Sequence, residues 1–69
     1  SMDILMRFVT DLPHGYRTVF NLYAIEGYSH SEIAEMLHIS EVTSRTQFIR
    51  ARKVLQKSVQ SLIMHEDAQ

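Results

Sequence analysis

The chain has 69 residues, of which 45% are hydrophobic and 22% charged, with a formal net charge of −1 and no cysteine. A chain of this length forms one small domain and buries too little surface to build a substrate cavity with its own supporting shell, so we expect no enzymatic activity. The lack of cysteine excludes disulfides, thiolate zinc sites and thiol catalysis. No apolar run approaches the roughly 20 residues that a membrane span needs, and no segment has the pattern of a signal peptide.

The charges are distributed unevenly along the chain. Residues 1–35 carry −3, residues 36–57 carry +4 and residues 58–69 carry −2. Five of the seven basic residues lie within thirteen positions, namely Arg45, Arg50, Arg52, Lys53 and Lys57. A local basic surface is therefore compatible with a slightly acidic chain, although a solvated helix face without a partner would have the same pattern.

The first half of the chain predicts two helices within residues 2–28. Apolar side chains recur with a 3.6-residue period at Ile4, Leu5, Phe8, Val9 and Leu12. This period indicates a first helix over about residues 3–11. Pro13 suits the first turn of a second helix, and Gly27 suits its left-handed end. Residues 16–25 are apolar on more than one side, so the second helix is expected to lie centrally.

The second half predicts two further helices over residues 29–63. Ser29 and Glu32 have the spacing of a capping box, which begins a third helix of about two turns. Ser40 is the next capping candidate, and it begins a long fourth helix that ends near Ile63. Residues 64–69 are expected to form a frayed tail. Because no segment alternates with a period of two, the predicted fold class is an all-α single domain, residues 1–69, with four helices.

A short helix, a turn of about three residues and a long basic helix describe a helix-turn-helix. Ala34 is the small residue where the two helices cross, since a larger side chain there would hold their axes apart. Ile33, Leu37 and Ile39 are expected to fill the space between them. These core residues set the angle at which the last helix is presented.

The outer face of the last helix carries the candidate DNA-binding residues. On a wheel of about 100° per residue, the positions opposite Phe48 include no acidic residue. Arg and Gln match the edges of guanine and adenine, whereas Lys suits phosphates. The residues assigned to bases are Arg45, Thr46, Gln47, Ile49 and Arg50. Those assigned to phosphates are Thr43, Arg52, Lys53 and Lys57. Ile49 is either a surface accident or a contact to a thymine methyl group.

Several motifs in this chain resemble one family, the C-terminal region 4 domain of extracytoplasmic-function (ECF) sigma factors of the sigma-70 family. The motifs are Leu12-Pro13-His14-Gly15-Tyr16-Arg17-Thr18-Val19-Phe20, Glu26-Gly27-Tyr28-Ser29-His30-Ser31-Glu32-Ile33-Ala34, Ile39-Ser40-Glu41, Thr43-Ser44 and Arg50-Ala51-Arg52. The resemblance implies a helical fold of the winged-helix-like or sigma region 4 type. It also implies that the chain is one part of a longer protein.

The resemblance further implies a function and partners. The domain is expected to recognise the promoter −35 element in double-stranded DNA, to dock on the β-subunit flap of RNA polymerase core and to be masked by an anti-sigma factor, all in the bacterial cytoplasm. Apolar residues that are candidates for partner binding are Ile4, Leu5, Phe8, Val9, Leu22 and Tyr23. Equally, these residues could simply close the core. Neither a membrane nor a small-molecule substrate is implied.

Three positions depart from the family pattern. His38 stands where a left-handed turn commonly has Gly, although His is among the residues that tolerate this backbone. Ser44 stands where Val is usual, which thins the local packing. Ile49 replaces a residue that is usually polar, which puts the base preference in doubt but not the docking mode.

Other functions explain less of the sequence. Four His residues suggest a metal, but none are paired at i, i+4 and no cysteine or carboxylate cluster supports them, so no metal or other cofactor is expected. The effector domain of response regulators shares Glu32-Ile33-Ala34 and Ile39-Ser40-Glu41, but typically lacks the motif around Pro13. A protein-interaction module whose basic helix binds an acidic partner is the remaining alternative.

Overall fold

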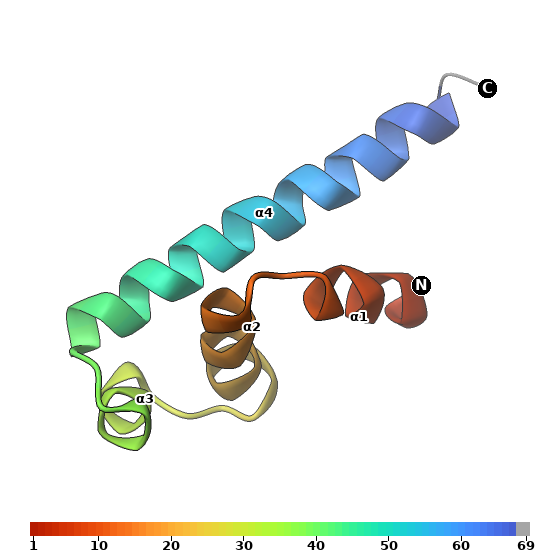
Figure 1. Cartoon of the computed structure of the whole chain (residues 1–69). Coiled ribbons are helices and arrows are strands. Elements are labelled where there is room, and N and C mark those ends of the chain that lie inside the picture. Colours follow the sequence, from red (N-terminus) through yellow and green to blue (C-terminus); the bar gives the residue numbers. More distant parts are fainter. Residues whose placement is uncertain (68–69) are drawn as a thin grey trace.

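The computed structural model describes residues 1–67, and their backbone forms helices joined by short connections (Figure 1). The elements are α1 (Met2–Thr10), α2 (His14–Phe20), the π-helical turn η1 (Asn21–Ile25), α3 (His30–Leu37) and α4 (Glu41–Asp67). None of residues 1–67 is a strand, so no β-wing accompanies the helix-turn-helix in this part of the chain. The all-α prediction is confirmed.

The second helix begins next to the proline that was expected to start it, and it ends in a different helical form. Pro13 is its N-cap, and the last turn, η1, is π-helical instead of α-helical. The N–H of Glu26 donates to the carbonyl of Asn21, five residues back, at 2.9 Å. Gly27 then ends the helix with φ +83°, as expected from its position. Apolar periodicity cannot distinguish a single π turn from an α turn, because the wider turn adds only one residue.

The third helix has both of the end structures that its sequence predicts. The hydroxyl of Ser29 accepts from the N–H of Glu32 at 3.1 Å, and the Glu32 carboxylate accepts from the N–H of Ser29 at 2.9 Å. His38 ends α3 in the left-handed conformation with φ +57°, and the N–H of Ile39 donates to the carbonyl of Ala34. Three residues, 38–40, therefore turn the chain into α4.

The fourth helix is longer than predicted. Its start agrees, since the Ser40 hydroxyl accepts from the N–H of Thr43 at 3.0 Å. Its end does not, because α4 continues to Asp67 and includes most of the expected frayed tail. Residues 58–67 contain neither Gly nor Pro, so no residue there interrupts the helix. Residues 68–69, the rest of that tail, lie outside the described part.

The core lies where α1 and α2 pack against the middle of α4. Its buried cluster consists of Val9, Leu12, Ala51 and Leu55, with Phe8, Tyr16 and Phe20 partly buried against it. Phe20 stacks on Phe48 with 5.9 Å between ring centroids. Ile33 is fully buried between α3 and its neighbours, as predicted, and Ala34 is partly buried beside it. This packing fixes the first half of α4, while its last turns project beyond α1 (Figure 1).

Candidate nucleic-acid interface

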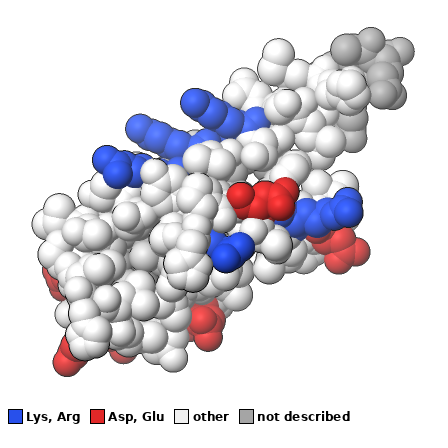
Figure 2. Space-filling model, viewed as in Figure 1, with Lys and Arg blue, Asp and Glu red and all other residues white. Residues whose placement is uncertain are grey.

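A row of basic side chains follows the outer side of α4. Arg50, Lys53 and Lys57 are exposed, and none of the three forms an ion pair among the described side chains. Figure 2 shows basic side chains along the edge of the molecule formed by α4, with acidic side chains over the lower part of the face shown. We call Arg50, Lys53 and Lys57 the basic row. Its unpaired cations are free to meet an anionic partner.

The first two turns of α4 present two hydroxyl groups next to the basic row. Thr43 is exposed, and its hydroxyl oxygen accepts a hydrogen bond from Ser40 at 2.8 Å, which orients it. Thr46 is half-buried and lies one turn before Arg50. Hydroxyl groups at such positions can serve bases or phosphates.

Two exposed apolar side chains lie on the same outer face. Ile49 is 52% exposed and Val42 is 69% exposed. They are seven residues apart, which places them on one side of α4, two turns from each other. Val42 was missed by the sequence reasoning, which sought charged and polar side chains at the start of α4. The signal in the sequence is that Val42 is apolar but lies away from the apolar stripe of the predicted helix.

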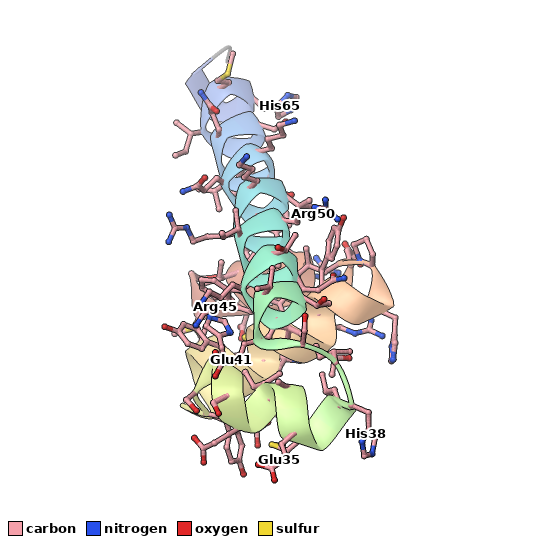
Figure 3. The ribbon with its side chains drawn as sticks, turned by 90° about the vertical axis from the view of Figure 1, so that its left-hand side faces the viewer. Glu35, His38, Glu41, Arg45, Arg50 and His65 are labelled. Carbon is pink, nitrogen blue, oxygen red and sulfur yellow. The ribbon has the colours of Figure 1, made fainter. Side chains whose placement is uncertain are left out.

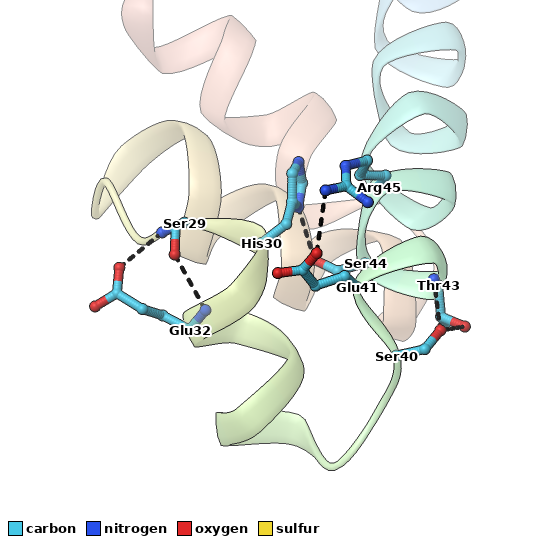
Figure 4. Close-up of polar contacts among 8 residues, drawn as sticks. All are labelled: Ser29, His30, Glu32, Ser40, Glu41, Thr43, Ser44 and Arg45. Carbon is cyan, nitrogen blue, oxygen red and sulfur yellow. Dashed lines mark hydrogen bonds and ion pairs between the residues drawn. The ribbon is translucent and has the colours of Figure 1, made fainter.

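Arg45 is not a free cation. Its guanidinium donates to the carboxylate of Glu41 at 3.2 Å, one turn earlier on α4, and both side chains are about half exposed (Figure 4). Figure 3 shows Arg45 and Arg50 on different sides of α4. Arg45 therefore flanks the outer face instead of extending the basic row.

Two residues assigned to DNA from the wheel face other parts of the protein. The carboxamide oxygen of Gln47 is buried and has no hydrogen-bond partner. It lies beside α2, where a Cβ added at Gly15 would meet it at 3.5 Å. Arg52 lines the groove between α1 and α4, together with Phe20 and Leu55. Gln47 is therefore turned toward α2, whereas Arg52 is exposed and its assignment to phosphates stays a prediction. The wheel was centred on Phe48, but the most buried side of α4 is turned toward Ser44 and Ala51.

The groove between α1 and α4 is strongly apolar. It has a volume of about 530 Å³ and is lined by Leu5, Phe20, Arg52, Leu55, Gln56, Val59, Gln60 and Ile63. We call it the α1/α4 groove. The sequence reasoning placed the apolar docking surface on the first two helices alone and missed the wall formed by α4. The continuation of the apolar stripe past Leu55 was the signal for that wall.

The predicted partner-binding residues divide into three groups. Ile4, Leu5 and Tyr23 are each 39% exposed. Phe8 and Leu22 are half-buried. Val9 is 2% exposed and belongs to the core cluster, so its assignment to a docking surface is wrong. Only Leu5 among the six lines the α1/α4 groove.

A compact cluster joins α3 to the first turns of α4. The Nδ1 atom of His30 lies 2.7 Å from the hydroxyl oxygen of Ser44, which is fully buried (Figure 4). The His30 ring also stacks on Tyr23, with centroids 4.1 Å apart, and meets the edge of Phe48. Burial, and then the Arg45 guanidinium, lower the pKa of His30, while Glu41 acts in the opposite direction. No sequence signal pairs His30 with Ser44, which lie fourteen residues apart.

Neither a metal-ligand cluster nor a membrane-spanning helix is found in the part of the chain that the structure describes. No three His, Asp or Glu side chains within it come together as ligands for a metal ion. None of its helices combines the length and the hydropathy needed to cross a membrane. The outer face of α4 itself presents cationic, hydroxyl and apolar side chains, which are the groups that contact nucleic acids.

Comparisons with known proteins agree with the helix-turn-helix. The family model described as sigma-70, region 4 matches residues 2–55. The chain is 33% identical over 61 residues to the ECF RNA polymerase sigma-E factor of Escherichia coli strain K12, and 30% identical over 60 residues to that of Haemophilus influenzae. These matches cover 88% and 87% of the chain but only 32% of each relative. The chain thus spans about a third of their length. No solved structure matches.

Proposed function

Because the chain belongs to the sigma-70 region 4 family, we propose that it is the promoter-binding domain of a bacterial ECF sigma factor. In this proposal α4 enters the major groove of the −35 element and so directs RNA polymerase to its promoters. The observation that carries the proposal is the basic row, whose exposed cations lie on the helix that α3 presents outward. Cations of this kind supply most of the affinity of a protein for DNA.

The residues on the outer face divide by their position along α4. Early residues of a recognition helix meet bases, and later ones meet the backbone. Thr46, Ile49 and Arg50 would therefore reach base edges, and Arg45 would do so once released from Glu41. Lys53 and Lys57 would neutralise phosphates, and Thr43 would donate to a phosphate at the start of the helix. Arg50 has the fork geometry for guanine.

Val42 and Ile49 extend this assignment to apolar contacts. Both are too exposed to contribute to the core. The methyl group of thymine is the apolar feature of the major groove, so these two side chains would favour A·T pairs where they touch. The promoter would then combine a guanine opposite Arg50 with thymines at positions near Val42 and Ile49.

The α1/α4 groove is the surface that we assign to the polymerase flap. Leu5 and Ile63 are exposed on its walls, whereas Leu55 closes its floor. An apolar segment of the β-subunit would bury these side chains without touching the basic row on the other side of α4. An anti-sigma factor that covered either surface would block promoter use.

The experiment is selection of bound sequences by the chain assembled with RNA polymerase core. The proposal predicts one enriched −35-type motif that contains guanine and that changes at one base pair in Arg50→Ala. Arg7→Ala is the matched control, since Arg7 is an exposed arginine on α1, away from α4. Recovery of sequences with no common motif would contradict the proposal and favour a module that binds an acidic protein.

A further inference from the structure

We propose that His30 is a positioning residue, which holds α4 at its DNA-reading angle only while its imidazole is neutral, so that promoter binding weakens in acid. The inference rests on the proposed function of α4 and adds a control of that same site. His30 touches no DNA in this account. It acts through Ser44 and Phe48, which belong to the first two turns of the recognition helix.

The contact between His30 and Ser44 is buried on the Ser44 side. Ser44 is the only polar side chain that is fully buried among the described residues, and the His30 ring is its side-chain partner at 2.7 Å. A buried hydroxyl group that loses its partner costs free energy, so this contact favours one arrangement of α3 against α4. Figure 4 shows the two side chains reaching toward each other across the helix-turn-helix.

The His30 ring also contacts a third element, η1. His30 stacks on Tyr23 of η1 with only 8° between the ring planes, and Phe48 of α4 lies at the edge of both rings. One imidazole therefore touches side chains from η1 and α4 while it belongs to the first turn of α3. If the imidazole moved, all three elements would have to repack around it.

A proton on His30 opposes this arrangement. In a neutral imidazole, one nitrogen can accept from the Ser44 hydroxyl. In the cation, both nitrogens are donors, so the Ser44 hydroxyl can no longer donate to the ring and its proton needs another acceptor. The carbonyl of Ser40, one turn earlier, already accepts from the N–H of Ser44. The charge would also lie in the first turn of α3, where the helix dipole disfavours cations.

The charged and titratable groups around His30 come from every element that packs there. They are Tyr23 from η1, Tyr28 from the loop, Glu32 from α3, and Glu41 and Arg45 from α4. The Glu32 carboxylate is held by Ser29 in the capping box, and the Glu41 carboxylate is held by Arg45. Burial, and then the Arg45 guanidinium, lower the pKa of His30 below its ordinary value of 6.5, and Glu41 acts against this shift without cancelling it.

The direction of the effect follows from this lowered pKa. The unfolded or rearranged chain takes up a proton near the ordinary value, and the native cluster does so only at lower pH. The native arrangement is therefore fully favoured above that value and loses stability as the pH falls below it.

The test compares the DNA affinity of the 69-residue chain at about pH 8 and about pH 5.5 by fluorescence anisotropy. We expect the affinity of the wild-type chain to fall at least about threefold. His30→Gln and His30→Tyr, of which the second keeps an aromatic ring on Tyr23, should lose this dependence and bind equally well or better in acid. His65→Gln is the matched control, because His65 is exposed at the far end of α4 (Figure 3).

A second readout keeps the inference separate from the proposed function. Urea unfolding of the same variants without DNA should show stability that falls in acid for the wild type and the His65→Gln control, and falls less for both His30 variants. If no variant binds DNA at either pH, the proposed function fails while the unfolding data still decide the role of His30. An identical pH profile in the wild type and in both His30 variants would overturn the inference.

Discussion

The Arg45 guanidinium lies 3.2 Å from the Glu41 carboxylate on the first turns of α4. One of the side chains that the sequence assigns to bases is therefore neutralised by an acid of the same helix. A half-exposed pair of this kind contributes at most about 1 kcal/mol to stability, so DNA can separate it at small cost. The pair restrains Arg45 in the free protein.

Removing this acid is expected to strengthen DNA binding. Glu41→Gln frees Arg45 and removes a negative charge near the phosphates, so the affinity should rise by roughly 0.5 to 1 kcal/mol at low salt. Its folding stability should fall by less than about 1 kcal/mol, because Glu41 also favours the N-terminus of α4. Anisotropy titrations measure the first effect and urea unfolding the second. Glu35→Gln makes the same charge change on α3, away from α4, and an equal gain there would contradict this role of the ion pair.

The apolar side chains of the outer face predict a specific sensitivity to thymine. Ile49→Ala should weaken binding to the selected promoter by about 1 kcal/mol, and it should have little effect when deoxyuridine replaces the contacted thymine. Comparing both proteins on both duplexes isolates the contact with the methyl group. Equal losses on the two duplexes would show that Ile49 does not touch that group.

The capping box predicts a local loss of stability with its own pH dependence. Ser29→Ala should lower the free energy of unfolding by about 1 kcal/mol. Ser31→Ala, two residues further along in the first turn of α3, should change it by less than about 0.5 kcal/mol. Hydrogen bonds from the backbone and then the side chain of Ser29 lower the pKa of Glu32. The stabilising effect of this carboxylate is therefore present above its ordinary value of 4.5 and is lost as the pH falls through the lowered value. Urea unfolding of Glu32→Gln should show a weaker decline in acid than the wild type.

The two left-handed positions predict changes of opposite sign. His38→Gly should raise the free energy of unfolding by roughly 0.5 to 1 kcal/mol, because φ is +57° and glycine adopts this backbone without the steric cost. Gly27→Ala should lower it by about 1 kcal/mol through the backbone alone, since no atom lies within 4 Å of the added methyl group. Thermal unfolding measures both. A stabilising Gly27→Ala would contradict the left-handed geometry at the end of η1.

The α1/α4 groove predicts a separation of polymerase binding from DNA binding. Ile63→Asp places a charge on an exposed wall of the groove without touching the core, and it should weaken capture by the polymerase β flap by about 1 to 3 kcal/mol. Its affinity for DNA should be unchanged within error. Val54→Asp is the control, because Val54 is a similarly apolar and exposed residue of α4 outside the groove. Surface plasmon resonance with immobilised flap measures the difference.

Local signals along the chain predicted most of the fold. The cap residues Ser29, Glu32 and Ser40, and the turn residues Gly27 and His38, set helix ends through contacts within a few residues, so their positions determine those ends. The end of α4 was predicted too early because its apolar stripe fades near Ile63. Helix continuation depends on the absence of interrupting residues, not on that stripe.

The site was harder to predict, because it depends on how the helices face one another. A wheel shows which residues share a face, but only packing shows which face is buried. Gln47 and Arg52 were assigned outward for this reason, and each lies toward α1 or α2. The pairing of His30 with Ser44 depends on the α3 to α4 crossing, which no local pattern encodes.

The most direct test of DNA recognition by α4 is the salt dependence of promoter affinity for the chain and two variants, measured by fluorescence anisotropy. We expect the affinity to fall steeply with salt, Lys53→Ala to reduce the logarithmic slope by about one on every duplex, and Arg50→Ala also to relax the base preference. DNA recognition by α4 would be contradicted by an affinity that is independent of salt. It would also be contradicted if both variants bound promoter and unrelated duplexes with the same affinities as the wild type.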